Sequence, residues 1–316
     1  MVHFLPGVRD PIERPETWPP TMELRRGADS IREHVGALEL LANTDFRAPY
    51  HWGRGVVYVG GGVYWPGIVV GIKLLREAGC NLPVEVWYRG SCEPVNSSDI
   101  DGVPGVYLID AERCSRGNRI MFSDGDRGGW EAKLYALSLT LFNEVLFLDA
   151  DAYCVRDPAP LFDLLYTAPL VFWSDLPRME STIVWDRVYP AGAGAVPTFQ
   201  GGQFVIDLSS AWRTLALAHW ICQHSDYFFA SMYGDQDAWR VALAAGKGRY
   251  RCLGPADWEQ PAFICRLDGA PYVVHRCQSK LFTAKPGAVG PSLPLEIRVW
   301  DLFRALCPDV FCEDVS

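Results

Sequence analysis

The stretch EVLFLDAD, residues 144–151, constrains the fold of this chain more than any other feature. Its apolar residues predict a short buried strand, and Asp149 and Asp151 follow that strand directly. The preceding residues, 131–142, carry leucines at helical spacing. Helices that alternate with buried strands are typical of layered α/β folds with parallel pairing. Because functional groups of such sheets lie at the carboxyl ends of strands, the two aspartates stand where a site is expected.

The same alternation of strand and helix runs through the rest of the chain. Residues 55–62 predict a buried strand that ends in a glycine turn, and the helix that begins near Pro66 stops at Gly79. Further strands are expected at residues 83–88, 103–109, 203–208 and 271–275, and further helices at residues 30–41, 211–224, 235–246 and 295–306. The expected helix caps are Ser209 or Ser210, and Asp235 or Asp237.

These elements predict one α/β domain with two flanking segments. Residues 51–285 would form the domain, with a mixed, mainly parallel central sheet flanked by helices. Residues 1–50 are rich in Pro, Arg and Glu and predict a partly irregular N-terminal arm. Residues 286–316 predict a C-terminal tail with a short helix.

Composition limits the classes of protein to which the chain can belong. Of its 316 residues, 49% are hydrophobic, which is enough for a sizeable core. The formal net charge of −9 excludes the broad basic surface of a nucleic-acid-binding protein. We find no apolar stretch that predicts a membrane span and no signal-peptide pattern. The ten cysteines form no CxxC pair, so reduced thiols in a cytoplasmic protein are expected.

Asp149 and Asp151 predict a site for a divalent cation. Two carboxylates at positions i and i+2 offer hard oxygen ligands, which Mg²⁺ and Mn²⁺ prefer, and a cation there can neutralise a leaving diphosphate. An EF-hand is excluded, because Tyr153 and Cys154 replace an oxygen ligand and a glycine. Two alternatives stay open. The aspartates could cap a turn, or they could serve an aspartyl phosphatase, with Asp149 as nucleophile and Asp151 as acid and base.

Five motifs, in this order, carry a resemblance to a known family. They are GVVYVGGGVYWPGIVVGIKLLREAGCNLPVEVWY, KLYALSLTLFNEVLFLDADAYCVRDPAPLFD, FWSDLPR, FQGGQFVID and GDQDAW. Over residues 55–280 the chain resembles nucleotide-sugar glycosyltransferases of the GT-A fold, which is Rossmann-like. It is most similar to the fungal-type mannosyltransferases that add α-1,3 branches, and less similar to the glycogenin and lipopolysaccharide galactosyltransferase family.

The resemblance implies a metal site made of three residues. Asp149 and Asp151 match the metal-binding DxD motif of the family, with Asp151 as a direct ligand. His275 matches a third ligand and Lys280 a diphosphate-binding lysine, roles that suit imidazole and ammonium groups. The interval from His275 to Lys280 is five residues rather than six and lacks a glycine, so a structural histidine stays the alternative. The implied cofactor is Mn²⁺ or Mg²⁺.

The resemblance also implies a nucleotide pocket at the first strand–helix turn. Tyr64 matches an aromatic residue that packs against the nucleobase, and Gly60, Gly61 and Gly62 would let the backbone approach the nucleotide closely. Gly and Val stand where the galactosyltransferase branch has Asp and Asn, so UDP and GDP both stay open. Lys133 would reach the nucleotide or its phosphate. The alternatives are a plain tight turn and a solvated surface lysine.

The remaining motifs match the sugar side of the site. Gln236 would lie near the reacting face of the sugar, and Asp235 and Asp237 would bind its hydroxyls, although Asp235 could instead be a helix N-cap. Trp173 would stack on an acceptor sugar or belong to the core. The residues matched to the lining of the sugar and acceptor pocket are Asp175, Gln200, Gly202 and Gln203.

These implications combine into one hypothesis for function. The chain is expected to be a metal-dependent, retaining glycosyltransferase that moves a hexose from GDP-mannose or a UDP-hexose to a hydroxyl group of a glycan or another acceptor. Because a glutamine amide is a poor nucleophile, the reaction would be dissociative, with an oxocarbenium-like species. A phosphatase and a glycosyltransferase-like binding protein without turnover stay open. We expect no nucleic-acid partner; the fungal relatives are Golgi membrane proteins.

Overall fold

The computed structural model describes residues 30–45, 48–49, 51–115, 129–259, 262–278, 280 and 295–307. Of the predicted flanking segments, residues 1–29 and most of 286–316 therefore lie outside the described residues. The helices expected in these segments are present as α1 (Ser30–Ala42) and α10 (Leu295–Leu306). The limits of the arm, the domain and the tail stay predictions.

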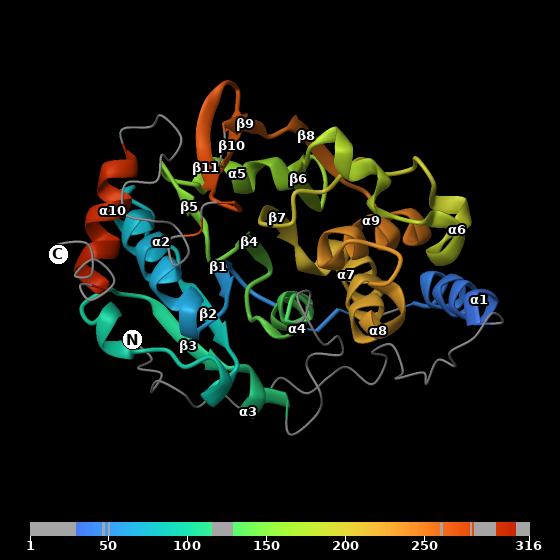
Figure 1. The fold of residues 1–316 in the computed structure, drawn as a ribbon, viewed down its shortest axis with the longest axis horizontal. Coiled ribbons are helices and arrows are strands. Elements are labelled where there is room, and N and C mark those ends of the chain that lie inside the picture. The colour runs from blue at the N-terminus through green and yellow to red at the C-terminus, as the bar shows by residue number, and fades with distance from the viewer. Residues whose placement is uncertain are drawn as a thin grey trace, which may run out of the picture.

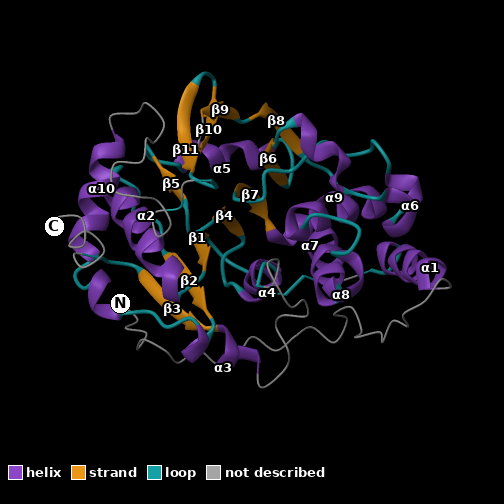
Figure 2. Cartoon of the chain, viewed as in Figure 1, coloured by secondary structure: helices purple, strands orange, loops and turns teal. Residues whose placement is uncertain are grey.

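A sheet of seven strands forms the centre of the molecule, as Figures 1 and 2 show. Its strand order is β3-β2-β1-β4-β7-β6-β8. Neighbouring strands pair in parallel except around β7, which is antiparallel to β4 and β6, so the predicted mixed, mainly parallel sheet is confirmed. The strands are β1 (Arg54–Val59), β2 (Val84–Tyr88), β3 (Val106–Asp110), β4 (Glu144–Leu148), β6 (Leu170–Ser174), β7 (Gln203–Asp207) and β8 (Arg251–Pro255).

One edge of this sheet collects the ends of several strands, and we call it the carboxyl edge. It holds the carboxyl ends of β1, β4 and β6. Because β7 runs in the opposite direction, its first residue, Gln203, also lies there, opposite Leu148. Residues that follow β1, β4 and β6, and those that precede β7, are therefore neighbours in space.

Helices cover both faces of the sheet because its central strands are apolar on both sides. Val57 and Phe147 belong to a core shared with α1, α4 and α7, whereas Val56 and Leu146 belong to a core shared with α2. Consecutive residues of a strand thus point into opposite cores. Each fully buried large apolar side chain contributes roughly 1.5–3 kcal/mol to the free energy of unfolding. The helices are α2 (Trp65–Glu77), α3 (Ala111–Ser115), α4 (Glu131–Leu139), α5 (Ala159–Asp163), α6 (Trp185–Val188), α7 (Leu208–Gln223), α8 (Ser225–Phe228) and α9 (Gly234–Gly246).

A second sheet of four antiparallel strands lies beside the first, in the order β5-β11-β10-β9. The strands are β5 (Ala152–Cys154), β9 (Asp257–Glu259), β10 (Ala262–Leu267) and β11 (Ala270–His275). Val273 faces the core around α2, and its neighbour Val274 packs with Val299 of α10. Only β11 among these strands was predicted from the sequence. The three-residue strands β5 and β9 carry little periodic pattern, and β10, with six residues, was missed.

Three element starts differ from those predicted. Helix α7 begins at Leu208 because Asp207 is its N-cap and accepts from the Ser210 amide at 3.1 Å, so the predicted serine caps are wrong. Helix α9 begins at Gly234 after the N-cap Tyr233, which makes the N-cap alternative for Asp235 wrong. Strand β3 begins three residues later than expected, after a turn over residues 101–105.

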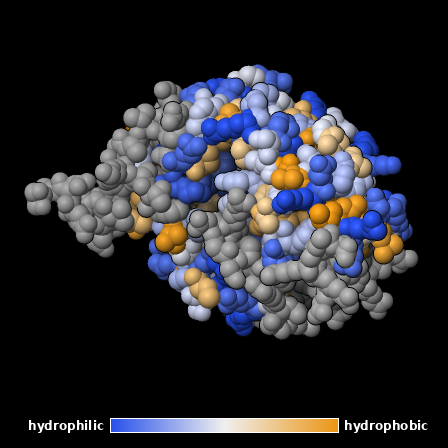
Figure 3. Space-filling view, turned by 45° about the vertical axis from the view of Figure 1, so that its right-hand side comes forward, coloured by the Kyte–Doolittle hydropathy of each residue, from blue (hydrophilic) through white to orange (hydrophobic). Residues whose placement is uncertain are grey.

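The described surface is mostly hydrophilic on the face shown in Figure 3, where hydrophobic residues form small groups. Among the helices that the structure describes, none has both the length and the apolar composition needed to cross a bilayer. The thiols of Cys80, Cys154, Cys222 and Cys265 are buried and free, and burial raises the pKa of each. These four cysteines fit the expectation of reduced thiols.

Candidate metal and nucleotide site

Three side chains that can ligate a divalent cation meet at the carboxyl edge. Asp149 follows β4, Asp151 precedes β5, and His275 ends β11. One ligand atom from each lies within 4.8 Å of the others. Asp151 and His275 are buried, and Asp149 is half-buried. Carboxylates suit both Mn²⁺ and Mg²⁺, and an imidazole suits Mn²⁺, so the residues fit the predicted cofactor, with Mn²⁺ the better match.

Pairing within and between the sheets brings these residues together. In the small sheet Ala152 pairs with His275, which places Asp151 beside the imidazole. The amide of Asp149 donates to the carbonyl oxygen of Gly202 at 2.8 Å, just before β7. The site is therefore assembled from two strand pairings that are distant in the sequence.

The imidazole of His275 is held in one orientation. Its Nδ1 lies 3.2 Å from Oε1 of Gln200, while its Nε2 lies 3.2 Å from Oδ1 of Asp151 and 3.9 Å from Oδ2 of Asp149. Burial alone would raise the pKa of Asp151, but His275 and Lys280 hold that pKa well below its usual value. Asp151 is therefore ionised, as a metal ligand must be.

Gly202 makes room for the histidine ring. A Cβ at this position would lie 2.2 Å from Cε1 and 2.5 Å from Nδ1 of His275, far inside van der Waals contact. Gly202 was matched to the sugar pocket in the sequence; in the fold it contacts the predicted metal ligand. Whether it also lines the sugar pocket stays a prediction.

Gly202→Ala is expected to displace the His275 ring and lower the affinity for Mn²⁺ about 10- to 100-fold, the range for residues that orient a ligand. Mn²⁺ titration by calorimetry measures this. Gly36→Ala is the matched control, because nothing lies within 4 Å of a Cβ at Gly36 in α1. It should leave Mn²⁺ binding unchanged. Unchanged Mn²⁺ affinity in Gly202→Ala would show that the ring is not a ligand held by this contact.

We call Asp149, Asp151 and His275 together the metal group. Lys133 of α4 joins this group to helix α9. Its Nζ lies 2.8 Å from Oδ1 of Asp149 and 3.2 Å from Oδ2 of Asp235. The side chain is only 16% exposed, so the alternative of a solvated surface lysine is wrong. Burial would lower the pKa of Lys133, but the two carboxylates raise it above its usual value.

Lys280 and Tyr64 lie beside Asp151. The Nζ of Lys280 donates to Oδ2 of Asp151 at 2.6 Å and lies 6.0 Å from the centre of the Tyr64 ring. Tyr64 is 37% exposed at the end of the first strand–helix turn. The structure thus brings both residues to one place, although their predicted ligands stay predictions.

The glycine turn after β1 has a structural reason of its own. Gly60 and Gly62 have φ angles of +143° and +54°, which favour glycine. A Cβ at Gly61 would lie 2.1 Å from the carbonyl oxygen of Glu93, and the Gly62 amide donates to the Pro94 carbonyl. The turn therefore needs these glycines, and their role in nucleotide binding stays a prediction.

The first turn of α9 presents its side chains to different neighbours. Asp235 faces Lys133, and burial raises the pKa of Asp235 to about 6 although Lys133 opposes this. Gln236 lies beside the turn before β7, because a Cβ at Gly201 would be 3.0 Å from Cβ of Gln236. Asp235 and Gln236 therefore lie near the metal group, as their predicted sugar-side roles require.

Asp237 is fully buried and has three polar partners. Its carboxylate accepts from the Tyr233 amide and the Thr182 hydroxyl, each at 2.7 Å, and from Arg240 at 3.2 Å. Burial raises the pKa of Asp237 despite these contacts. This geometry gives Asp237 a supporting role in α9, while its predicted contact with a sugar stays a prediction.

Two residues at the carboxyl end of β6 differ in how far they reach the site. Asp175 is half-buried, and burial raises its pKa although the Leu176 amide and His275 lower it. Trp173 is 1% exposed and its indole N–H donates to the Arg266 carbonyl oxygen at 2.8 Å. Trp173 is thus a core residue and not a stacking surface for an acceptor sugar.

Two residues near the site were missed in the sequence. A Cβ at Gly67 of α2 would lie 2.4 Å from the Ala150 carbonyl oxygen, so this glycine lets α2 pack on the loop that carries Asp149 and Asp151. Arg240 is buried and pairs with Asp237 and Glu180. Its spacing of three from Asp237 in a predicted helix was the available signal.

Comparisons with known proteins identify a family and a fold that this chain resembles. Residues 53–185 match the family described as a mannosyltransferase family. Over 160 residues the chain is 32% identical to the α-1,2-mannosyltransferase MNN24 of Candida albicans, and the match covers 49% of this chain and 22% of the relative. Over 134 residues it is 31% identical to MNN21 of the same organism, which covers 39% and 20%. The match thus spans about a fifth of these relatives.

A solved structure of an active-site mutant of the galactosyltransferase LgtC shows the same fold. The identity is 16%, the TM-score is 0.50, and the match covers 79% of this chain and 95% of the other. The resemblance to fungal mannosyltransferases is confirmed, but these relatives carry the α-1,2 name rather than the expected α-1,3 one. The chain therefore has the GT-A fold of glycosyltransferases, and its residues 53–185, with the DxD motif, are similar to those of mannosyltransferases.

Proposed function

We propose that this chain is a metal-dependent, retaining hexosyltransferase that uses a nucleoside diphosphate sugar. One observation carries the proposal: Asp149, Asp151 and His275 meet between Lys133 and Lys280 at the carboxyl edge. This arrangement lies in a GT-A fold and includes the stretch that matches mannosyltransferases. It combines groups for a cation with groups for a phosphate anion, which a nucleoside diphosphate requires.

The cation would be held by Asp149, Asp151 and His275. When bound, Mn²⁺ or Mg²⁺ supplies positive charge that stabilises a leaving diphosphate. The two lysines supply further hydrogen-bond donors to phosphate oxygens, since each Nζ already lies within 3 Å of an aspartate oxygen of the group. Tyr64, beside Lys280, would place the nucleobase at this end of the site.

The sugar would lie toward α9, beyond Lys133. Asp235 and Gln236 are the candidates for contact with it, and Asp175 approaches from the end of β6. The amide of Gln236 is too weak a nucleophile for a stable covalent intermediate, so we infer a dissociative transfer with retention. The acceptor proton would then move to an oxygen of the departing diphosphate.

Mannose is the favoured sugar, because both Candida albicans relatives are named α-1,2-mannosyltransferases. GDP-mannose is accordingly the first donor to test, followed by UDP-hexoses. The acceptor is proposed to be a hydroxyl group of a glycan. The phosphatase alternative gains no support, because the fold and the matched family are those of glycosyltransferases.

A donor panel tests the proposed function. Purified chain with Mn²⁺ is incubated with GDP-mannose and UDP-hexoses, with and without a mannoside acceptor, and the released nucleotide is measured. We expect release from one donor, whereas a phosphatase would release inorganic phosphate from a phosphomonoester. A binding protein without turnover would release neither.

Nucleoside diphosphates are expected to stabilise the chain only when Mn²⁺ or Mg²⁺ is present, because the diphosphate needs the cation held by the two aspartates and His275. At about 100-fold excess over the dissociation constant, the gain in free energy of unfolding is roughly 2.7 kcal/mol. Melting temperatures with UDP and GDP, each with and without metal, measure this. No shift with either nucleotide would contradict the proposed function.

A further inference from the structure

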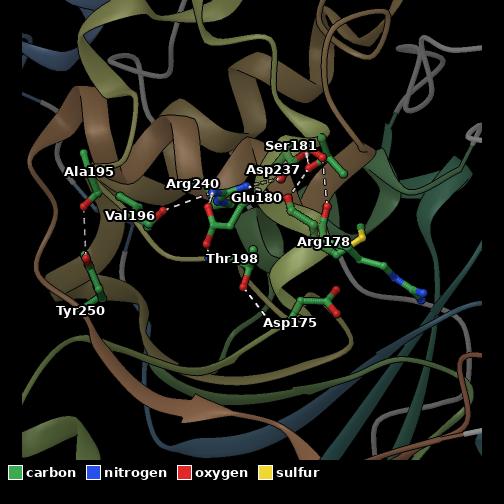
Figure 4. Close-up of polar contacts among 12 residues, drawn as sticks. Asp175, Arg178, Glu180, Ser181, Ala195, Val196, Thr198, Asp237, Arg240 and Tyr250 are labelled. Carbon is green, nitrogen blue, oxygen red and sulfur yellow. Dashed lines mark hydrogen bonds and ion pairs between the residues drawn. The ribbon is translucent and has the colours of Figure 1, made fainter. Parts of the chain in front are cut away.

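Arg240 is a buried cation that no step above uses. Its side chain is 1% exposed in the middle of α9, one turn after the predicted sugar-side residues. Figure 4 shows its guanidinium at the centre of a polar cluster that joins α9 to two segments after β6. A buried charge is costly unless it is paired, and both terminal NH₂ groups of this guanidinium have acceptors in the cluster.

The guanidinium contacts acceptors from three segments. It donates to Asp237 of α9 at 3.2 Å, to the Glu180 carboxylate at 2.7 Å and to the Met179 carbonyl oxygen at 3.3 Å. It also donates to the Val196 carbonyl oxygen at 3.3 Å. The planar fork of arginine allows these several directed bonds, which the single ammonium of a lysine cannot reproduce.

Two chains of contacts lead from Arg240 back to the site. The first chain runs through Glu180 and Thr198 to Asp175. The Thr198 amide donates to the Glu180 carboxylate at 3.2 Å, and the Thr198 hydroxyl donates to the Asp175 carbonyl oxygen at 3.0 Å. Through Asp237 the cluster fixes the first turn of α9, because Asp237 accepts from the Tyr233 amide. Figure 4 shows Asp175, Thr198 and Glu180 on one side of the guanidinium and Asp237 beside it.

We propose that Arg240 is a positioning residue of the reacting centre, which holds Gln236 of α9 at a set distance from Asp175. The inference rests on the proposed function, since it assigns these residues to the sugar side. Arg240 itself contacts neither the metal group nor Lys133 or Lys280 in any contact that the structure describes. Its loss should therefore affect the chemical step more than the binding of a nucleoside diphosphate, because small misplacements of reacting groups cost rate.

The test compares Arg240→Met and Arg240→Lys with Arg266→Met. Arg266 is the matched control, since it also pairs with two carboxylates, Asp257 and Glu259, but in the small sheet. We expect Arg240→Met to lower kcat by about 10- to 100-fold, with an unchanged metal-dependent melting shift by GDP or UDP. Arg240→Lys should lie between it and wild type, and Arg266→Met should match wild type.

Two outcomes in folded protein would overturn the proposal. The first is a kcat for Arg240→Met within about threefold of Arg266→Met, below the smallest effect expected from misplacement. The second is a loss of nucleoside diphosphate binding together with kcat, which would indicate a general collapse of the site. If Arg240→Met does not fold, Glu180→Gln is the substitute variant, because it removes the charge of the half-exposed partner of Arg240. We expect a smaller loss of kcat in this variant and an unchanged melting shift by GDP or UDP. An unchanged kcat in Glu180→Gln would then reject the proposal.

Hydrogen exchange separates this inference from the proposed function. In Arg240→Met the amides of Thr198 and Tyr233, which bond to Glu180 and Asp237, should exchange about tenfold faster than in Arg266→Met, while those of β4 stay unchanged. Equal exchange in both variants would reject Arg240 as the support of these segments. A wild-type chain that releases nucleotide from no donor would reject the proposed function, and with it the catalytic part of this inference.

Discussion

Asp151→Asn is expected to abolish transfer and the Mn²⁺-dependent binding of nucleoside diphosphate. Asp151 lies 3.2 Å from His275 and 2.6 Å from Lys280, so its charge would serve both the cation and the lysine proposed to bind phosphate. Changing a residue that merely supports a metal ligand lowers metal affinity or activity about 10- to 100-fold. The loss of the ligand itself should have an effect beyond that range. Turnover with the preferred donor and Mn²⁺ titration measure the two effects.

Asp163→Asn is the matched control for this substitution. Asp163 is exposed at the end of α5, and its side chain makes no capping hydrogen bond to the helix that follows. The control should keep the turnover and melting temperature of the wild type. If Asp151→Asn turned over normally, and did so in EDTA, the metal site would not be the one that we describe.

Lys133→Met is expected to destabilise the chain and to stop transfer. Lys133 is the shared partner of Asp149 and Asp235, so its loss leaves two carboxylates facing each other. Removing one partner of a buried ion pair typically lowers the free energy of unfolding by about 3–5 kcal/mol. Donor binding should also weaken, because a phosphate-binding charge is lost. Chemical denaturation measures the first effect and donor titration the second.

The cost of Lys133→Met should depend on pH through Asp235. Burial already raises the pKa of Asp235 to about 6 in the wild type, and the loss of Lys133 would raise that pKa further. An acid whose folded-state pKa is raised favours folding below its unfolded-state pKa, and this stability is lost as the pH rises through the folded-state value. The deficit of the variant should therefore be smaller at pH 5 than at pH 8.

A double variant separates stability from activity. Lys133→Met with Asp235→Asn removes the uncompensated charge, so it should recover much of the lost stability while transfer stays absent. Lys73→Met, on α2, is the lysine control and should resemble the wild type. Recovery of transfer in the double variant would mean that Lys133 acts only on the fold and not on the donor.

The local patterns of the sequence were sufficient for the α/β fold class and for the two aspartates of the candidate metal site. The helix predicted over residues 131–142 is present as α4 but ends at Leu139, and the strand 144–148 follows from apolar spacing alone. The position of Asp149 and Asp151 follows from the end of that strand. Neighbouring residues along the chain encode such patterns, so no tertiary information is needed. The same holds for helix α10 and for the glycine after α2.

Only the tertiary structure decided which distant residues share the site. His275 joins the aspartates because β5, too short to be seen in the sequence, pairs with β11, and Lys133 is buried because α4 packs against the first turn of α9. The same long-range packing buries Trp173 and connects Arg240 to Glu180. Such contacts depend on chain pairings and on space left by glycines such as Gly202, which no local period records.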